Sequence, residues 1–109
     1  MTEIRDATEC PRDFTSEPAS FGQARTVVWK TATSRESGAR LLAAQWQHVY
    51  AVRMRQRIVA PRTLKWYATE AGTSYDRLGK LLRGVIVMRL EDLAMADMIL
   101  GEISGKNRE

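Results

Sequence analysis

Residues Thr63–Gly84 read TLKWYATEAGTSYDRLGKLLRG, and two short helical patterns meet within them at the glycine of the GTS triplet. Gly72 can take the positive φ that a tight turn between helices needs. Ser74 offers a hydroxyl that caps the free N–H groups of the following helix. Ala68, four residues before Gly72, leaves room for the two helices to approach. The pattern therefore predicts a helix, a tight turn and a second helix.

The second helix is expected over residues 75–83, with one buried face. Leu78 and Leu81 are three residues apart and share that face, so they should pack back on the preceding helix. Gly84 then ends the helix as a C-terminal cap. Upstream, Pro61 suits a first helical turn because its missing N–H costs nothing there. The first helix of the pair should run from about Pro61 or Leu64 to residue 71.

This unit resembles a helix-turn-helix of the Cro/C1 (lambda-repressor-like) family. The resemblance rests on Tyr67, Ala68, Gly72, Ser74, Leu78, Leu81, Arg83, Gly84, Leu90, Leu93, Ala96, Leu100 and Gly101. It covers about half of the chain and implies an all-α fold, a small helical bundle whose second helix enters the DNA major groove. LacI-type regulators share much of the pattern but carry a large ligand-binding domain, for which this chain has no room.

Two positions depart from the family pattern. Many members have a glutamine one residue into the first helix of the pair, where this chain has Leu64, which cannot donate a hydrogen bond. Many also have a glutamate before the Arg-Gly pair, where this chain has Leu82. We therefore expect a different scheme for anchoring the DNA backbone.

Residues advance by about 100° along a helix, which turns the polar side chains of the second helix away from its leucines. Family pattern and geometry agree on the base-facing candidates: Tyr75, Asp76, Gly79, Lys80 and Arg83. Arginine and lysine can donate to guanine O6 and N7, and aspartate can accept from a cytosine amino group or position a lysine four residues later. The glycine should let the backbone approach a base closely.

A second group of side chains lies near helix starts or on basic faces, where phosphates can be held. These phosphate candidates are Arg53, Arg57, Arg62, Thr63, Lys65, Thr73 and Ser74. Two alternatives stay open. The hydroxyls of Thr63 and Ser74 could do no more than cap helices, and the arginine face around residues 53–57 could meet only solvent.

The net charge of +4 is unevenly distributed. Residues 25–90 hold thirteen Lys and Arg against three acidic residues, a net charge of +10, whereas the segments before and after each carry −3. The basic charge is thus concentrated on the helix pair and the helix before it, as expected of a phosphate-binding surface.

Several classes of protein fit the composition poorly. No run of about 18 apolar residues is present, and the N-terminus lacks an apolar signal core, so we expect a cytoplasmic protein without a membrane span. Cys10 has no partner for an internal disulfide, and one histidine beside one cysteine makes no zinc set. The same scarcity argues against an enzyme, and no cofactor is expected.

The remaining segments complete the expected organisation. Residues 1–24 resemble a disordered or loosely attached acidic tail, and residues 26–31 are a possible short strand that pairs with a second copy or straps the helices. Thr33 and Glu36 fit a capping box. A helix of about 24 residues should follow, with apolar residues from Leu41 to Val52 repeating at helical spacing and an end at residue 58 or 59.

A last amphipathic helix is expected from Leu90 to Gly101, followed by a frayed tail over 104–109. Met95 and Met98 suit its core side, with a dimer interface as the alternative. The helical domain would then span residues 25–103. The leading hypothesis is a sequence-specific DNA-binding regulator, a repressor acting as a homodimer on a two-fold-related operator in double-stranded DNA. The alternative is a helix-turn-helix that binds a protein, as in an antitoxin.

Overall fold

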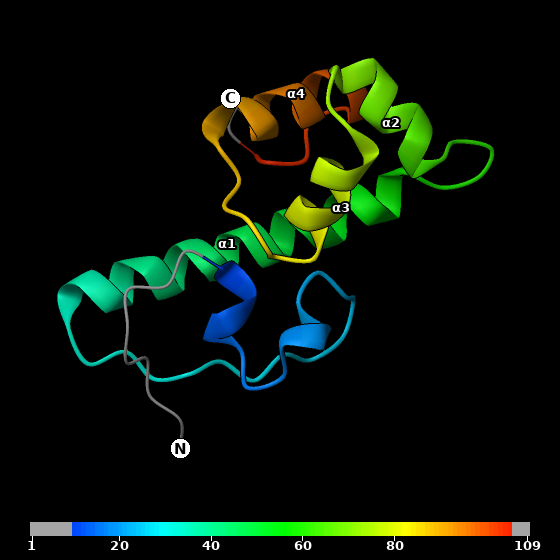
Figure 1. Ribbon diagram of the computed structural model, residues 1–109. Helices are drawn as coiled ribbons and strands as arrows, with labels where there is room; N and C mark the ends of the chain where they lie inside the picture. The colour runs from blue at the N-terminus through cyan, green and yellow to red at the C-terminus, as the bar shows by residue number, and fades with distance from the viewer. Residues whose placement is uncertain (1–9, 106–109) are drawn as a thin grey trace.

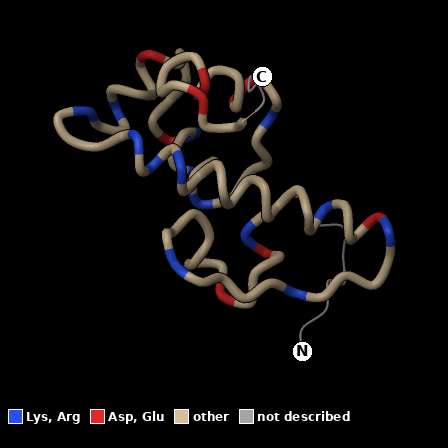
Figure 2. The backbone as a smooth tube through the Cα atoms, turned by 180° about the vertical axis from the view of Figure 1, so that it is seen from behind, with Lys and Arg blue, Asp and Glu red and all other residues tan. Residues whose placement is uncertain are grey.

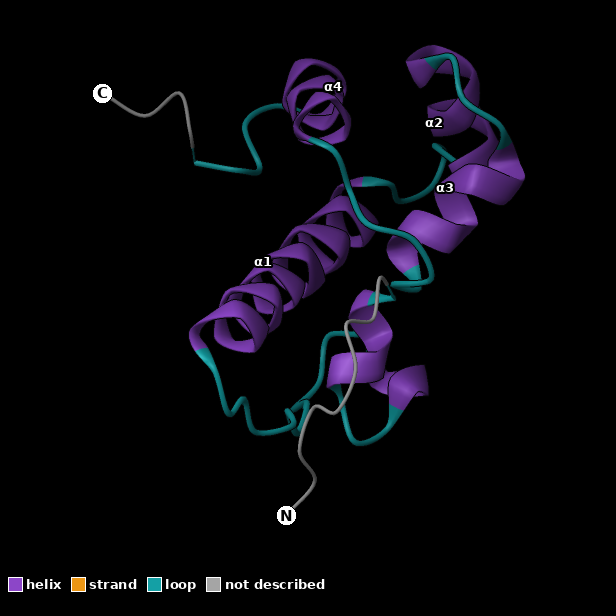
Figure 3. Ribbon diagram, turned by 60° about the vertical axis from the view of Figure 1, so that its left-hand side comes forward, coloured by secondary structure: helices purple, strands orange, loops and turns teal. Residues whose placement is uncertain are grey.

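The computed structural model describes residues 10–105. In that part the chain forms four α-helices, preceded by two short 3-10 helices. These are η1 (Pro11–Phe14), η2 (Pro18–Ser20), α1 (Arg35–Arg57), α2 (Leu64–Ala71), α3 (Tyr75–Leu82) and α4 (Leu90–Leu100). Helix α1 is the long spine, with α2, α3 and α4 gathered around its C-terminal half and η1 and η2 against another side (Figure 1). The predicted all-α fold is confirmed, and Figure 3 shows no strand among the described residues.

The helix pair forms as the sequence predicts. Helix α2 begins at Leu64, because the Thr63 hydroxyl accepts a hydrogen bond from the backbone N–H of Trp66 at 3.0 Å. The Ser74 hydroxyl caps α3 in the same way, accepting from the Arg77 N–H at 3.0 Å. Gly72 ends α2 with φ of +70°. Both helices therefore begin at side-chain caps that their own sequence supplies.

Gly72 and Gly84 close α2 and α3 with the same arrangement of hydrogen bonds. The N–H of Thr73 donates to Ala68 O at 3.0 Å, and the N–H of Val85 donates to Lys80 O at 2.9 Å. These six-residue closures, with glycine in the left-handed region, are Schellman motifs. At Gly84 the glycine serves a second purpose, since an added Cβ would lie 2.6 Å from the Phe21 ring.

The start of α1 differs from the predicted Thr33–Glu36 capping box. Ser34 is the N-cap, its hydroxyl accepts from the Ser37 N–H at 3.1 Å, and Ser37 Oγ accepts from the Ser34 N–H at 3.1 Å. Glu36 instead pairs with Arg40 at 2.6 Å. The prediction was wrong by one residue because serine at both ends of the box satisfies the same two N–H groups.

The N-terminal segment corrects a second expectation. Residues 1–9 lie outside the described part, but residues 10–24 do not form a loose tail, because Phe14 and Phe21 are buried in the fold. The segment is tied to α1 by the N–H of Gly22, which donates to His48 Nδ1 at 2.8 Å. Gly22 also sits against the end of α3, where an added Cβ would lie 2.2 Å from Leu82 O.

Residues 26–31 form an extended strap rather than a regular strand. Within the strap, Trp29 forms an isolated antiparallel bridge with Thr15. The Trp29 ring lies edge-on to the rings of Phe21 and His48, with centroids 6.5 and 5.7 Å apart. Of the predicted alternatives, the strap that packs on the rest of the chain is the one observed.

The buried face of α1 is also not the one that its apolar pattern suggested. The core side carries Ala44, Gln47, Ala51 and Met54, whereas the larger Leu42, Trp46 and Val49 are exposed. The Gln47 side chain donates to Ile86 O and accepts from the Met88 N–H, both at 2.9 Å. Small residues and a glutamine face inward because the N-terminal segment and the 85–88 connector lie close against the helix.

Helix α4 ends at Gly101 as predicted, but it buries Ala96 and Leu100 and leaves Met98 exposed. The expectation that Met98 lies in the core was therefore wrong, while Met95 is half-buried. Ala96 and Leu100 are one turn apart, and Met98 falls on the other side of the helix. Of the tail expected over 104–109, Ser104 is held by the Asp97 carboxylate, and residues 106–109 lie outside the described part.

The main core joins the N-terminal segment to all four helices. Its members are Phe21, Ala51, Met54, Ile58, Tyr67, Ala68, Leu78, Leu82, Ala96, Leu100 and Ile103. Leu81 is buried as well, as predicted. No helix between residues 10 and 105 has the length and apolar character needed to cross a membrane.

Candidate nucleic-acid interface

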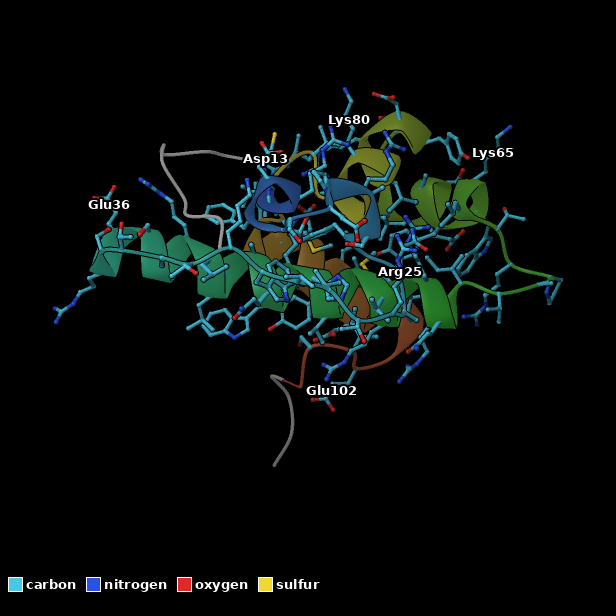
Figure 4. The ribbon with its side chains drawn as sticks, turned by 90° about the horizontal axis from the view of Figure 1, so that it is seen from below. Asp13, Arg25, Glu36, Lys65, Lys80 and Glu102 are labelled. Carbon is cyan, nitrogen blue, oxygen red and sulfur yellow. The ribbon has the colours of Figure 1, made fainter. Side chains whose placement is uncertain are left out.

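Helix α3 presents a polar outer side and buries its apolar one. Leu78 and Leu82 are almost completely inaccessible, whereas Asp76 is exposed and Tyr75 keeps 53% of its surface accessible. Lys80 projects to the same side of the molecule as Lys65 of α2, opposite to Glu102 (Figure 4). The predicted orientation of α3 is therefore observed.

Two of the predicted base-facing residues pair with each other. Lys80 Nζ lies 3.1 Å from a carboxylate oxygen of Asp76, one turn earlier. Both side chains are well exposed, so the pair contributes little to stability and its members are readily separated. Asp76 therefore positions Lys80, as one of the two sequence interpretations predicted.

Arg83 stays on the exposed side of α3 and lies against Gly79, another of the predicted base-facing positions. It lies at the C-cap of α3, and its guanidinium folds back along the helix toward Gly79. An added Cβ on Gly79 would stand 2.8 Å from Arg83 Nη1. The missing side chain at Gly79 thus leaves space for the arginine, which explains a glycine in the middle of a helix without a contact to a base.

Two of the phosphate candidates around α2 lie against aromatic rings, one on α3 and one on α2. Lys65 Nζ lies 5.8 Å from the centroid of the Tyr75 ring, and the Arg62 guanidinium lies 4.8 Å from that of Trp66. Such cation–π contacts hold the two cations on the outer surface without neutralising them. Thr63 and Ser74 act as caps of α2 and α3, and Thr73 is half-buried in the turn between these two helices.

Arg53 and Arg57 are placed elsewhere. Arg53 donates to Ile103 O and Arg57 donates to Leu100 O, each at 2.7 Å. The two arginines therefore brace the end of α4 and the loop after it, from the side of α1 that meets those residues. The structure brings them to the C-terminal loop and not to the outer side of α3.

Arg55 stands between these two arginines in the basic stretch considered from the sequence for phosphate contact, but it was not singled out as a candidate. It points to another side of α1, and its Nε is buried without a hydrogen-bond partner. Burial, and then the neighbouring Arg83 cation, lower the pKa of Arg55. A helical projection, which turns Arg55 about 200° away from Arg53, was the one signal in the sequence that separated it from its neighbours.

A second contact that the sequence did not reveal joins α3 to α4. Arg77 donates to both carboxylate oxygens of Asp92, each at 3.0 Å, and Asp92 also accepts from the Arg89 N–H at 2.8 Å. Burial alone would raise the pKa of Asp92, but these hydrogen bonds and charges lower it. The bidentate pair fixes the rotation of α3 against α4.

Charge separates along the molecule. Acidic residues gather at α4, while basic residues follow the C-terminal half of α1 and the loop leading to α2 (Figure 2). In the described residues, no group of His, Cys, Asp and Glu is arranged to hold a metal ion.

Comparison with protein families, with curated proteins and with solved structures finds no match for this chain. The resemblance to the Cro/C1 family therefore stays a prediction from the residues quoted above.

Proposed function

We propose that this protein is a sequence-specific DNA-binding transcription regulator, a repressor that places α3 in the major groove. The outer side of α3 is the observation that supports this proposal best. It carries Tyr75, Asp76 and Lys80 on a helix whose two ends are fixed by Ser74 and Gly84. Rigid placement of a few polar side chains is what base recognition requires.

In this proposal the chemistry is divided between bases and backbone. Lys80 donates to guanine O6 or N7 once it separates from Asp76, whose carboxylate then accepts from a cytosine amino group. Lys65, beside Tyr75 of α3, and Arg62, at the start of α2, neutralise phosphates, which supplies affinity without sequence preference. The hydroxyl of Thr73 adds a hydrogen bond at the turn.

A two-fold-related operator requires two copies of α3, and the exposed apolar side chains of α4 suit the contact between them. Leu90 and Met98 each keep 81% of their surface accessible. Apolar side chains exposed together commonly mark a protein contact. Sedimentation should show a dimer of the wild-type chain and a monomer of Met98→Glu, with Glu91→Gln as a control; a wild-type monomer bound to DNA would remove the homodimer from the proposal.

The test of DNA binding is selection of bound sequences from random duplexes at two salt concentrations. We expect one enriched motif with two-fold symmetry and a tighter complex at low salt. A steep dependence on salt with no enriched motif would contradict a sequence-specific regulator.

The exposed side chains of α4 also favour a second candidate, a module that binds another protein through a helix-turn-helix, as an antitoxin does. Charge reversal of Lys80 separates the two. Lys80→Glu should abolish base preference if α3 reads DNA, whereas docking of a protein on α4 should not respond to it.

A further inference from the structure

Arg55 of α1 is near enough to Arg83 for that cation to lower its pKa, and α1 packs against α3 in this region. Ala51, one turn before Arg55, lies beside Gly22, which in turn rests on Leu82 O at the end of α3. Arg83 follows directly at the C-cap of α3. Two guanidinium groups from separate helices are thereby held on one side of the molecule.

Within the described part of the chain, neither arginine has an anionic partner. The ion pairs within residues 10–105 involve other cations, namely Arg40, Arg77, Lys80 and Arg89. Among those residues, Arg55 Nε is the one buried side-chain nitrogen or oxygen without a hydrogen bond. Leaving a charged donor unsatisfied is unfavourable, and a second cation beside it adds to the cost.

The surrounding residues leave the guanidinium groups of Arg55 and Arg83 available to a ligand. Gly79 has no side chain to block the Arg83 guanidinium, and Arg53 and Arg57 are turned to the other side of α1, each with a carbonyl acceptor there. An arginine that lacks both a carboxylate and a carbonyl partner retains its planar set of donors. Paired guanidinium groups of this kind suit phosphate, whose oxygens can accept two hydrogen bonds from each arginine.

We propose that Arg55 and Arg83 together bind one phosphate group, and that in the complex with DNA this is a backbone phosphate at the edge of the groove occupied by α3. Arg83 then holds the backbone instead of reading a base. Its position explains why Gly79 is a glycine and why Arg55 keeps a buried donor. The assignment to DNA rests on the proposed function, whereas phosphate binding by the two arginines does not.

Phosphate binding is tested first on the free protein. Titration with inorganic phosphate and pyrophosphate, followed through the Nε–Hε signals of the arginines by NMR, should shift Arg55 and Arg83 together and leave Arg53 unchanged. Phosphate should also raise the melting temperature of the wild-type chain and of Arg53→Gln, but not that of Arg55→Gln. Equal responses of Arg53 and Arg55 would overturn the site.

The DNA arm compares the same variants on the selected duplex. Arg55→Gln should weaken binding about tenfold on matched and mismatched duplexes alike and lower the slope of log K against log salt by about one. Arg53→Gln should change neither quantity. Specific binding with an unchanged slope in Arg55→Gln would overturn this site and leave the proposed function standing. If free phosphate shifted the NMR signals of Arg55 and Arg83 but no DNA motif were enriched, the proposed function would be overturned and the phosphate site would stand.

Discussion

Helices α3 and α4 are joined by the side chains of Arg77 and Asp92, yet their outer surfaces are opposite in character. Helix α3 buries its leucines and exposes an aspartate, a lysine and a tyrosine. Helix α4 exposes Leu90 and Met98 and buries an alanine and a leucine. The apolar residues of α3 are therefore used to hold the fold, while several of those on α4 remain available.

This difference assigns different partners to the two helices. A polar outer face on a helix whose ends are capped suits a charged, hydrated surface such as a DNA groove. An apolar outer face is stabilised by covering it with another protein surface, including a second copy of the chain. The four predictions below test this contrast, in order of decreasing effect.

Leucine-to-alanine substitution should separate the helices most clearly. Leu78→Ala on α3 removes a side chain that is 1% accessible and should lower the free energy of unfolding by about 3 kcal/mol, through lost burial and the cavity left behind. Leu90→Ala on α4 makes the same chemical change at an exposed site and should stay within about 0.5 kcal/mol. Denaturant unfolding at low protein concentration measures both, and similar losses would contradict the contrast.

Removing the link between the helices should cost less. Asp92→Ala leaves Arg77 without its bidentate partner in a largely buried position, so we expect a loss of about 2 kcal/mol. Glu91→Ala, next to it in the sequence, removes an exposed carboxylate that pairs with Arg89 at 3.6 Å, and little should change. Denaturant unfolding gives both values. Equal stability of the two variants would mean that α3 is oriented without α4.

What the sequence predicted well is chemistry contained within a few residues. Thr63, Ser74, Gly72 and Gly84 act as the caps that their types and spacing indicate, because the backbone groups satisfied at these caps lie three to five positions apart. From these positions the helix pair and the polar face of α3 could be placed.

What escaped prediction depends on contacts between distant segments. Phe14 and Phe21 stand alone in a polar stretch and show no period, so nothing local indicated that they enter the fold. Helical spacing gave α1 an apolar stripe but could not say that it faces outward, because the side of a helix that is covered is decided by the segments that pack on it. The nearness of Arg83 to Arg55, which lowers the pKa of Arg55, is of the same kind.

The outer faces can also be compared by function. Lys80→Ala on α3 should weaken binding to the selected duplex by about 1 to 2 kcal/mol and reduce discrimination at one base pair, because a donor to a base edge is lost. Met98→Ala on α4 should leave base preference unchanged. Competition titrations with single-base variants of the operator measure this difference. A change of preference in the α4 variant, without one in the α3 variant, would exchange the roles of the two helices.

The smallest effect is expected from a fall in pH, which should destabilise α3 before it destabilises α4. His48 Nδ1 accepts a hydrogen bond from Gly22, the residue that rests on the end of α3, so the bond requires a neutral imidazole. Burial lowers the pKa of His48 below its ordinary value of 6.5. The unfolded chain therefore takes up a proton first as the pH falls, so the stabilisation is complete above about pH 6.5 and declines below it.

The pKa values of Asp92 and Asp97 are lowered from 3.8, so these carboxylates change the stability only at more acidic pH. Between pH 6.5 and 5, the change of stability with pH therefore comes from the histidine. In that range, the amide protection factors of Leu82 and Gly84, which correct for slower intrinsic exchange at lower pH, should fall before those of α4. His48→Gln should remove this pH dependence, since the glutamine carbonyl accepts a hydrogen bond at any pH in this range. If protection fell equally in both helices, the N-terminal segment would brace the whole domain and not α3 in particular.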